Sequence, residues 1–460
     1  MPAHPIDFEI QAHVFSTPEG LNIFAETSRF QRWLDFEAAL AVSQADLGLI
    51  PPEAAATIQA KARVDQLDLG MAQAEYTTNR NSLTPILKAL RQACGPHGDY
   101  VHHGATTQDA IDTGQALELK AVLGLVRRDL NQLIEQLLTL AARHRDLAMV
   151  GRTHSQQALP ITLGLKFSVW LLELNRHADR LQFLAPRALT GQLGGAVGTM
   201  AALGPQGREL RDRVMARLGL TAAAGPWHTA RDNSAEVGAL CAMLTATAAK
   251  MANEVFQLGK TEVMELGEPA PAGKSAGSST MPHKRNPVLC ERIVVLSSHV
   301  RALSQVLMEA MIGENERDPR ALWSEWLAMP QICIYTLAGL DYLKAILTNL
   351  AINPENITKN LHIQPGAVAS EWLLFALTPK LGKAQAQIRI AHVLKEAATS
   401  GRPLADCLAD DPELAACLPK LDLTGLEHPE TYTGLAPELV DDAIRLVNHR
   451  RQERAAQPLP

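Results

Sequence analysis

Aromatic side chains are scarce in this chain, and their scarcity limits the kind of core it can build. They make up only 4% of the 460 residues, although apolar residues make up 47%. The core must therefore be filled mainly by alanine, leucine, valine and isoleucine, which suits packed helices. A chain of this length is long enough to bury a large core and to hold several structural regions.

Cysteine and basic charge are also in short supply. The six cysteines are scattered at spacings that fit neither a zinc site nor a disulfide framework, so we expect reduced, buried thiols. The net charge of −6 gives no reason to expect a nucleic-acid or anionic-membrane partner. No uncharged apolar stretch is long enough to span a bilayer, and residues 1–11 lack the pattern of a signal peptide. We expect a soluble, cytoplasmic protein.

Apolar residues recur at helical spacing through most of the chain. The clearest run, between Asp109 and about Asp146, predicts a helix of ~38 residues and ~57 Å that packs along its whole length. Similar patterns predict helices at about 159–186, 232–266, 288–312 and 322–350, and several helices of such length indicate an elongated bundle. The seam of the first helix consists of Leu119, Leu123, Val126, Leu130, Leu133, Leu137 and Leu140.

Proline and glycine divide the chain into three regions. They predict an N-terminal helical domain at 1–108, a central domain of long helices at 109–352 and a C-terminal helical domain at 353–460. Strand signals are confined to short stretches near 147–151 and 191–199. The predicted fold class is therefore all-α.

One segment carries most of the chemical information. Residues 277–287 read G-S-S-T-M-P-H-K-R-N-P, with two adjacent hydroxyls after a glycine, a proline, and then a lysine and an asparagine. This combination suits a loop that closes over an anionic substrate. Lys284 and Asn286 supply one cation and one amide donor, which can stabilise negative charge that builds up on a carboxylate.

Two threonines precede the first long helix. Thr106 and Thr107 offer hydroxyl donors where free backbone N–H groups and the helix dipole favour an anion. The same residues are also typical of an ordinary helix cap, and capping does not exclude anion binding.

Three segments together resemble the fumarase/aspartase superfamily. Residues 277–287 match its signature, 102–109 (H-H-G-A-T-T-Q-D) resemble its first region and 151–156 (G-R-T-H-S-Q) its second, in the family's order. The resemblance implies a three-domain all-α fold in which the central helices of four subunits form one bundle, with active sites shared between subunits. It further implies a small dicarboxylate or polycarboxylate substrate and no metal or organic cofactor.

The resemblance also assigns roles to individual residues. The family reaction removes a proton from the carbon beside a carboxylate and expels a group from the next carbon. Ser278, the first serine after the glycine, is then the base, and Ser279 contributes hydrogen bonds. His154 protonates the leaving group and is held by Glu291. Taken alone, His154 would be interpreted as a surface or core residue and Glu291 as a helix-surface charge.

Further residues fall where family members contact substrate. His102 matches a family histidine near the substrate, and Arg231 either binds a second carboxylate or caps the helix that follows it. The remaining candidates are Gln156, Asn81 and Arg80.

The branch of the superfamily is less well defined than the family itself. An adenylosuccinate lyase usually has a histidine after the arginine at the position of Arg80, and small hydroxyls and an arginine where this chain has Trp323 and Trp326. A purine nucleotide is therefore not the expected substrate. Several segments, including 226–228 and 431–434, look more like the 3-carboxy-cis,cis-muconate cycloisomerase branch.

His154 and Glu291 favour elimination over lactone formation. Bacterial cycloisomerases of that branch usually have tryptophan at the position of His154, since no amine leaves in their reaction. We therefore predict a fumarate-releasing lyase that breaks a C–N bond in a small aspartate- or succinate-type polyacid. A cycloisomerase is the alternative. A catalytically dead homologue is a third hypothesis, disfavoured because the predicted catalytic set is complete.

Overall fold

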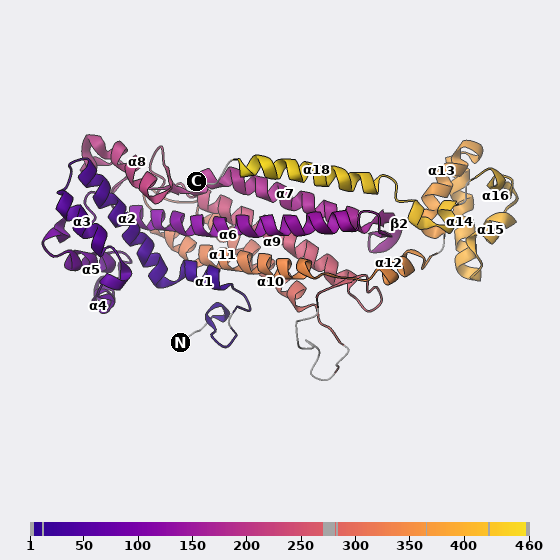
Figure 1. Ribbon diagram of the computed structural model, residues 1–460, viewed down its shortest axis with the longest axis horizontal. Helices are drawn as coiled ribbons and strands as arrows, with labels where there is room; N and C mark the ends of the chain where they lie inside the picture. The colour runs from indigo at the N-terminus through magenta and orange to yellow at the C-terminus, as the bar shows by residue number, and fades with distance from the viewer. Residues whose placement is uncertain are drawn as a thin grey trace.

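The computed structural model describes residues 4–11, 13–269, 281, 284–364, 366–421 and 424–456. Within these ranges the molecule is an elongated bundle of long helices with smaller helical units at its two ends (Figure 1). The predicted all-α fold class is confirmed, because the described strands form only short two-stranded pairs. No helix in the described part of the chain is long and apolar enough to cross a membrane.

Five helices run along the long axis and form the bundle. They are α6 (Thr107–Arg143), α7 (Leu163–Ala188), α9 (Asp232–Leu258), α10 (Val288–Glu309) and α11 (Pro319–Thr348). Helix α10 packs against α9 and α11, and α6 packs against α7 and α11. All five helices that the periodicity predicts are confirmed. Most boundaries differ by a few residues, but α9 ends at Leu258, where the apolar pattern predicts a helix as far as about residue 266.

Helix α6 sets the length of the bundle. Its 37 residues extend about 55 Å at 1.5 Å per residue. The predicted seam from Leu119 to Leu137 is buried, with each of its six side chains at most 4% exposed, and Leu140 is half-buried. Apolar burial along the whole seam holds α6 in place from one end of the molecule to the other.

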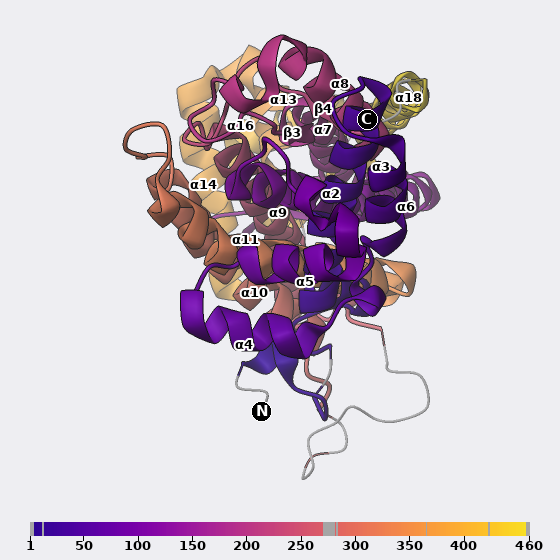
Figure 2. The same cartoon turned by 90° about the vertical axis from the view of Figure 1, so that its left-hand side faces the viewer.

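The N-terminal helices gather at one end of the bundle, which faces the viewer in Figure 2. They are α1 (Pro18–Phe24), α2 (Glu26–Asp46), α3 (Pro52–Lys61), α4 (Leu69–Asn79) and α5 (Thr84–Cys94). Helix α8 (Gly207–Leu218), from the middle of the sequence, packs against α2 at the same end. This unit therefore contains more than the predicted domain 1–108.

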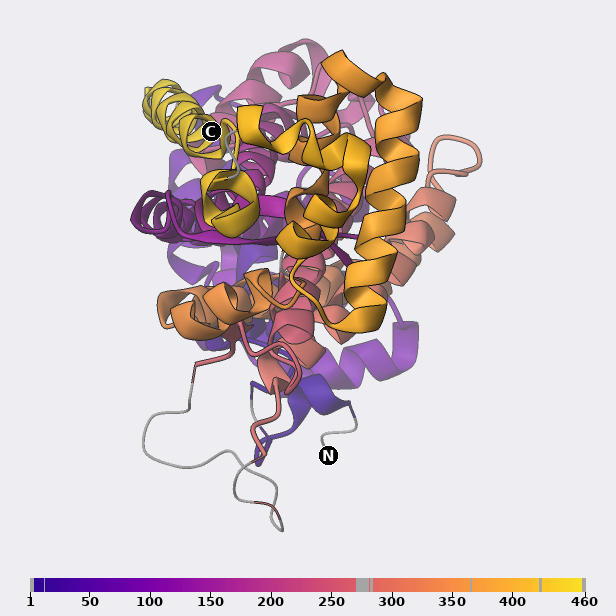
Figure 3. The ribbon, with the colours of Figure 1, turned by 90° about the vertical axis from the view of Figure 1, so that its right-hand side faces the viewer.

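The opposite end carries a compact unit with its own apolar core, which includes Leu373, Leu377 and Leu414 (Figure 3). Its last helix does not stay there. Helix α18 turns back along the bundle and packs on α7 and α6, and its Val440 and Val447 join the main core (Figure 1). The apolar face of α18 thus packs on the bundle, and the predicted domain boundaries at 108 and 353 stay predictions. The helices are α12 (Pro354–Leu361), α13 (Ser370–Leu381), α14 (Lys383–Ser400), α15 (Leu404–Asp410), α16 (Pro412–Ala415), α17 (Thr424–Glu427) and α18 (Ala436–Ala455).

A β-hairpin follows α6. Strand β1 (Ala148–Thr153) pairs antiparallel with β2 (Gln156–Thr162), and the register shifts between Val150 and Arg152. The apolar spacing predicts a helix from about residue 159, but Pro160 lies in β2 and the helix starts at Leu163. Proline, which cannot donate to a ladder, is tolerated next to such an irregularity.

Two shorter pairs complete the described strands. Strands β3 (Thr190–Gly191) and β4 (Thr221–Ala222) are parallel, and β5 (Leu266–Gly267) and β6 (Ala351–Ile352) are antiparallel. The second pair links the end of α9 to the end of α11.

The close approach of α7 to the end of α6 gives a stability prediction. A Cβ on Gly164 would lie 2.8 Å from the carbonyl oxygens of both Ala141 and His144. We expect Gly164→Ala to lower the free energy of unfolding by about 1–3 kcal/mol, measured by urea denaturation, because backbone would have to shift.

Gly124→Ala is the matched control. Gly124 lies inside α6, and a Cβ added to it would meet no neighbouring atom of the described residues within 4 Å. This variant should gain about 0.5–1 kcal/mol, because glycine loses more backbone entropy than alanine in a helix. Equal stability of the two variants would contradict the packing described for Gly164.

Candidate functional site

The predicted site residues fall into two groups at opposite ends of the bundle. His102, Thr106 and Thr107 lie at or just before the start of α6, and Arg80 and Asn81 lie between α4 and α5 in the N-terminal unit at the same end. His154 and Gln156 lie in the hairpin beyond the end of α6, on the far side of its length of about 55 Å. One chain therefore does not bring Thr106 and His154 together.

Lys284, Asn286 and Glu291 belong with the hairpin end. All three are exposed, and Glu291 lies in the first turn of α10. The backbone N–H of Cys290, in the same turn, donates to the carboxylate of Glu268, which follows β5 closely. The start of α10 is thereby tied to the segment that packs beneath the hairpin.

The two predicted serines, Ser278 and Ser279, lie outside the described residues. Their roles as base and hydrogen-bond donor stay predictions. His154 and Glu291 are both described and exposed, and they make no hydrogen bond with each other within the chain. Their predicted pairing therefore also stays a prediction.

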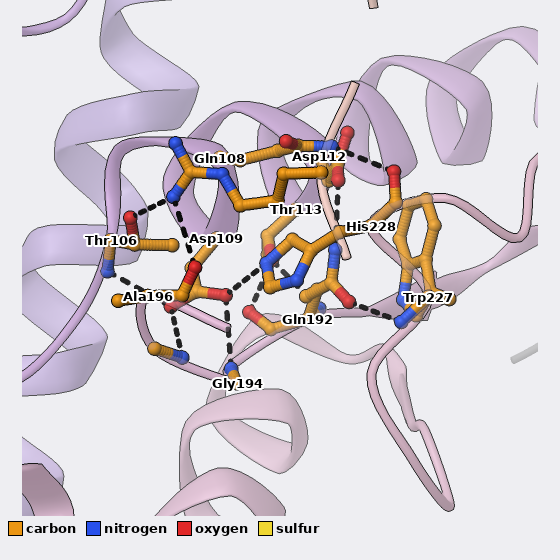
Figure 4. A network of polar contacts seen from close by, with 12 residues as sticks. Thr106, Gln108, Asp109, Asp112, Thr113, Gln192, Gly194, Ala196, Trp227 and His228 are labelled. Carbon is orange, nitrogen blue, oxygen red and sulfur yellow. Dashed lines mark hydrogen bonds and ion pairs between the residues drawn. The ribbon is translucent and has the colours of Figure 1, made fainter. Parts of the chain in front are cut away.

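Asp109 organises the start of α6 (Figure 4). Its fully buried carboxylate accepts from the backbone N–H groups of Thr106 at 3.0 Å, Gly194 at 2.9 Å and Gly195 at 3.0 Å, and contacts His228 Nε2 at 3.0 Å. An ionised carboxylate is well suited to accept from several donors at once. These bonds fix the glycine turn against the first turn of α6, next to Thr106.

Arg317 adds a cation that the sequence analysis did not assign to the site. Its guanidinium donates to the hydroxyl of Thr106 and, at 3.5 Å, to the carbonyl of Ala196. Arg317 is exposed and follows Thr106 by 211 positions, so no local pattern reveals this contact. Thr106, Arg317 and the N-terminus of α6 together form a positive, donor-rich surface suited to a carboxylate.

Arg231 has a different place from the one predicted. Its side chain is completely buried between Asp112, at 3.0 Å, and Glu325, at 2.7 Å. Burial raises the pKa of Asp112 to about 6, although Arg231 opposes this shift. Because the guanidinium is committed to two internal carboxylates, Arg231 supports the core beneath the site and does not face a substrate.

Asn81 and Arg80 occupy the link between α4 and α5. The side-chain oxygen of Asn81 accepts from the backbone N–H groups of Leu83 at 3.1 Å and Thr84 at 2.9 Å, so Asn81 holds the turn that leads into α5. Arg80 ends α4 with a positive φ of 52°. Both are exposed, and their contact with a substrate stays a prediction.

His102 points into the protein on one side. Its Nδ1 lies 2.6 Å from Oε1 of Glu37, and Glu37 is 1% exposed. Burial lowers the pKa of His102, but the carboxylate of Glu37 outweighs burial and the net pKa lies above its ordinary value. The charged form of His102 is therefore favoured just before the start of α6.

His154 lies at the tip of the hairpin. Thr153 pairs with Gln156, which leaves His154 and Ser155 as a two-residue connection with positive φ at both positions, 52° and 62°. Such turns favour Asn-Gly, because a non-glycine residue in this region costs about 1–3 kcal/mol. A strained, exposed position of this kind makes His154 a candidate for function, and its predicted acid role stays a prediction.

The described grooves do not coincide with either group. A groove of about 770 Å³ lies between α6, α7 and α18, and its lining includes Arg127, Asn131 and Arg451. None of the predicted site residues lines it. This is expected if each chain carries only part of a site.

The His102–Glu37 pair gives a pH-dependent prediction. Because the folded-state pKa of His102 is raised, the pair stabilises the fold below the unfolded pKa of about 6.5 and loses this effect as pH rises through the folded pKa. We expect Glu37→Gln to cost about 1.5–3 kcal/mol at pH 6, the range for hydrogen bonds to charged groups, and less at pH 9. Urea unfolding at both pH values measures the difference, and an equal cost at the two would contradict the raised pKa.

Known proteins share this architecture along nearly the whole chain. A family model described as "Lyase" matches residues 14–302, and one described as "Adenylosuccinate lyase C-terminus" matches residues 366–443. An N-acetyl-S-(2-succino)cysteine lyase of Dickeya dadantii (strain 3937) is 36% identical, over 97% of this chain and 98% of the relative. An adenylosuccinate lyase of Methanothermobacter thermautotrophicus is 37% identical, over 96% of this chain and 98% of the relative.

A solved structure agrees with these relatives. The 3-carboxy-cis,cis-muconate lactonizing enzyme from Pseudomonas putida matches with a TM-score of 0.88 at 34% identity, over 95% of this chain and 98% of the other. The long-helix bundle, the three ordered sequence motifs and the family models all point the same way. The chain belongs to the fumarase/aspartase superfamily of lyases.

Proposed function

We propose that the protein catalyses β-elimination from a small 2-substituted succinate and releases fumarate. The observation that carries this proposal is His154, an exposed histidine held on a strained hairpin turn. An elimination needs a proton donor for the departing group, and histidine is suited to that task near neutral pH. Lactone formation needs no such donor at this position.

The leaving atom in this proposal is sulfur or nitrogen. The presence of both His154 and Glu291 favours nitrogen, because an amine leaves with a proton from an acid. Two relatives, 36% and 37% identical over 97% and 96% of this chain, are named N-acetyl-S-(2-succino)cysteine lyase, and that name supports a thioether of succinate as the first substrate to test. A lyase that cuts the bond between sulfur and the succinyl carbon gives a thiol and fumarate, so atoms balance without a further reactant.

The leaving group in this proposal is small. Trp326 is partly buried, and its ring lies 6.0 Å from that of Trp33 and 5.5 Å from the guanidinium carbon of Arg29. Its neighbour Trp323 is 57% exposed. Neither indole offers the charged donors that a nucleotide phosphate requires, which supports a leaving group without a phosphate.

The proposed active site is completed by other copies of the chain in a homotetramer. Thr106 and His154 lie at opposite ends of α6, so a substrate bound at one needs the other from a second copy. Helix α10 leaves Val294, Val295 and Met308 between 38% and 48% exposed. An apolar face of this kind on a bundle helix is suited to burial against an identical chain.

The proposed chemistry divides among the two groups of residues. Thr106, Thr107 and Arg317 bind one carboxylate, and Lys284 and Asn286 stabilise the charge that develops on the other. Ser278 takes the proton from the carbon beside that carboxylate. His154 then donates a proton to the heteroatom as its bond to carbon breaks. Each tenfold gain in rate requires about 1.4 kcal/mol of transition-state stabilisation.

Cycloisomerisation is the second candidate. It is favoured by the lactonizing enzyme from Pseudomonas putida, which matches this chain with a TM-score of 0.88. In that reaction a carboxylate of 3-carboxymuconate adds across a double bond, no group leaves and fumarate does not form. The products therefore distinguish the two candidates.

A product assay tests the proposal. The protein is incubated with N-acetyl-S-(2-succino)cysteine, with N-substituted aspartates and with 3-carboxymuconate, and fumarate and lactone are quantified by chromatography. We expect fumarate from at least one succinate derivative, and none after Ser278→Ala. Lactone without fumarate would establish the second candidate instead.

His154→Ala separates nitrogen from sulfur. We expect a loss of about 10²–10⁴-fold in kcat with an amine leaving group. The loss should be smaller with a thiol, because a thiol has a pKa of about 8.5 and can leave as a thiolate without first taking a proton from His154. His392→Ala is the matched control, because His392 is an exposed histidine on α14. An unchanged rate in His154→Ala with an amine substrate would contradict the acid role.

A further inference from the structure

A single buried carboxylate lies beneath the hairpin that carries His154. Arg152 donates to Glu265 through both ends of its guanidinium, Nη1 to Oε2 at 2.9 Å and Nη2 to Oε1 at 2.6 Å. Glu265 is completely buried, and the side chain of Arg152 is 23% exposed. This two-point contact fixes the direction of Arg152 as well as its position.

The opposite strand is tied to the same carboxylate. Gln157 is the cross-strand partner of Arg152, and its Nε2 donates to the backbone carbonyl of Asn360 at 3.0 Å. The side-chain amide of Asn360 donates in turn to Oε1 of Glu265 at 2.8 Å. The cross-strand pair Arg152–Gln157, one pair away from the strained turn, is therefore connected to Glu265 on both strands. Arg152 bonds to Glu265 directly, and Gln157 is connected to it through Asn360.

Glu265 is itself held by rigid elements. Its backbone N–H donates to the carbonyl of Leu258, at the end of α9, at 2.9 Å. Its carbonyl accepts from the N–H of Asn353, just before α12, at 3.0 Å. Glu265 therefore lies where the end of α9, the β5–β6 pair and the start of α12 meet. Because its backbone is fixed by these elements, its carboxylate is a fixed anchor for the hairpin.

Stability alone does not account for this arrangement. A buried ion pair often contributes little net stability compared with apolar residues of the same size, because both charges lose their hydration. A hairpin could also reduce its strain by placing Asn-Gly at the turn. The anchored pair Arg152–Gln157 beneath the strained turn suits a different purpose, which is to hold the side chain of His154 in one direction.

We propose that Glu265, through Arg152 and Asn360, is a positioning residue for His154. It holds the turn so that the imidazole projects from the chain toward a substrate bound mainly by another copy. This inference rests on the proposed function, in which His154 protonates the leaving group. Glu265 does not touch the substrate and acts only through the orientation of His154.

A double-mutant cycle tests the inference. Glu265→Gln keeps the shape of the side chain but removes its charge, so the guanidinium of Arg152 loses an ionic partner. On a substrate with an amine leaving group we expect kcat to fall about 10–100-fold while KM changes less than threefold, and on a thioether we expect no larger loss than His154→Ala itself shows. In a His154→Ala background the same substitution should have almost no further effect, because a positioning residue cannot act without the residue it positions.

Two further variants keep the test informative. Glu262→Gln is the matched control, since Glu262 is exposed three residues before Glu265, and it should keep the wild-type rate. Gln157→Ala removes only the bond to Asn360 and serves if Glu265→Gln does not fold. It should lower kcat several-fold in the wild type and not in His154→Ala.

The outcomes separate this inference from the proposed function. If His154→Ala keeps the wild-type rate on a substrate with an amine leaving group, the proposed acid role is wrong. If His154→Ala loses activity but Glu265→Gln lowers kcat by the same factor in both backgrounds, Glu265 acts elsewhere and only the positioning role is wrong. An unchanged kcat in both Glu265→Gln and Gln157→Ala would also overturn it.

Discussion

The rigid length of α6 is the constraint on which the rest of this molecule depends. A continuous helix of about 55 Å, buried along its leucine seam, keeps Thr106 and His154 far apart. The hydrogen bonds of the helix leave no hinge through which one chain could close this distance. Any reaction that needs both residues must therefore take place where ends of different chains meet, and the exposed apolar face of α10 offers a surface for such contact.

Both ends of the bundle use the same physical device to shape their loops. At one end Asp109 accepts from three backbone N–H groups and contacts His228, and at the other Glu265 accepts from Arg152 and Asn360. A carboxylate offers several acceptor positions and no donor, so it gathers N–H groups from segments far apart in sequence. Because each carboxylate is fully buried, the loss of one partner leaves an unpaired polar group and is costly.

The sequence predicts the long helices because helical periodicity is local, and α6 is found where its leucines place it. Local periodicity does not reveal contacts between segments that are far apart in the sequence. Pro160 is a plausible first residue of a helix until its pairing across the hairpin with Val150 is known. Arg231 has the same side chain whether it faces a substrate or two buried carboxylates. The resemblance to a family predicts which residues matter, but the contact of Arg317 with Thr106 emerges only in three dimensions.

The return of α18 to the bundle changes how the small unit formed by α13 to α17 is attached. Helix α12 contacts β1 on one side of it and α18 packs on α7 on the other, so the unit is an insertion between two anchored helices and not a tail. The unit is also held by the hairpin itself, because Val368 packs in one apolar cluster with Val150 of β1 and Leu361 of α12. Attachment at both ends and on the hairpin gives the unit a fixed place beside His154, which a segment joined to the bundle at one end only would not have.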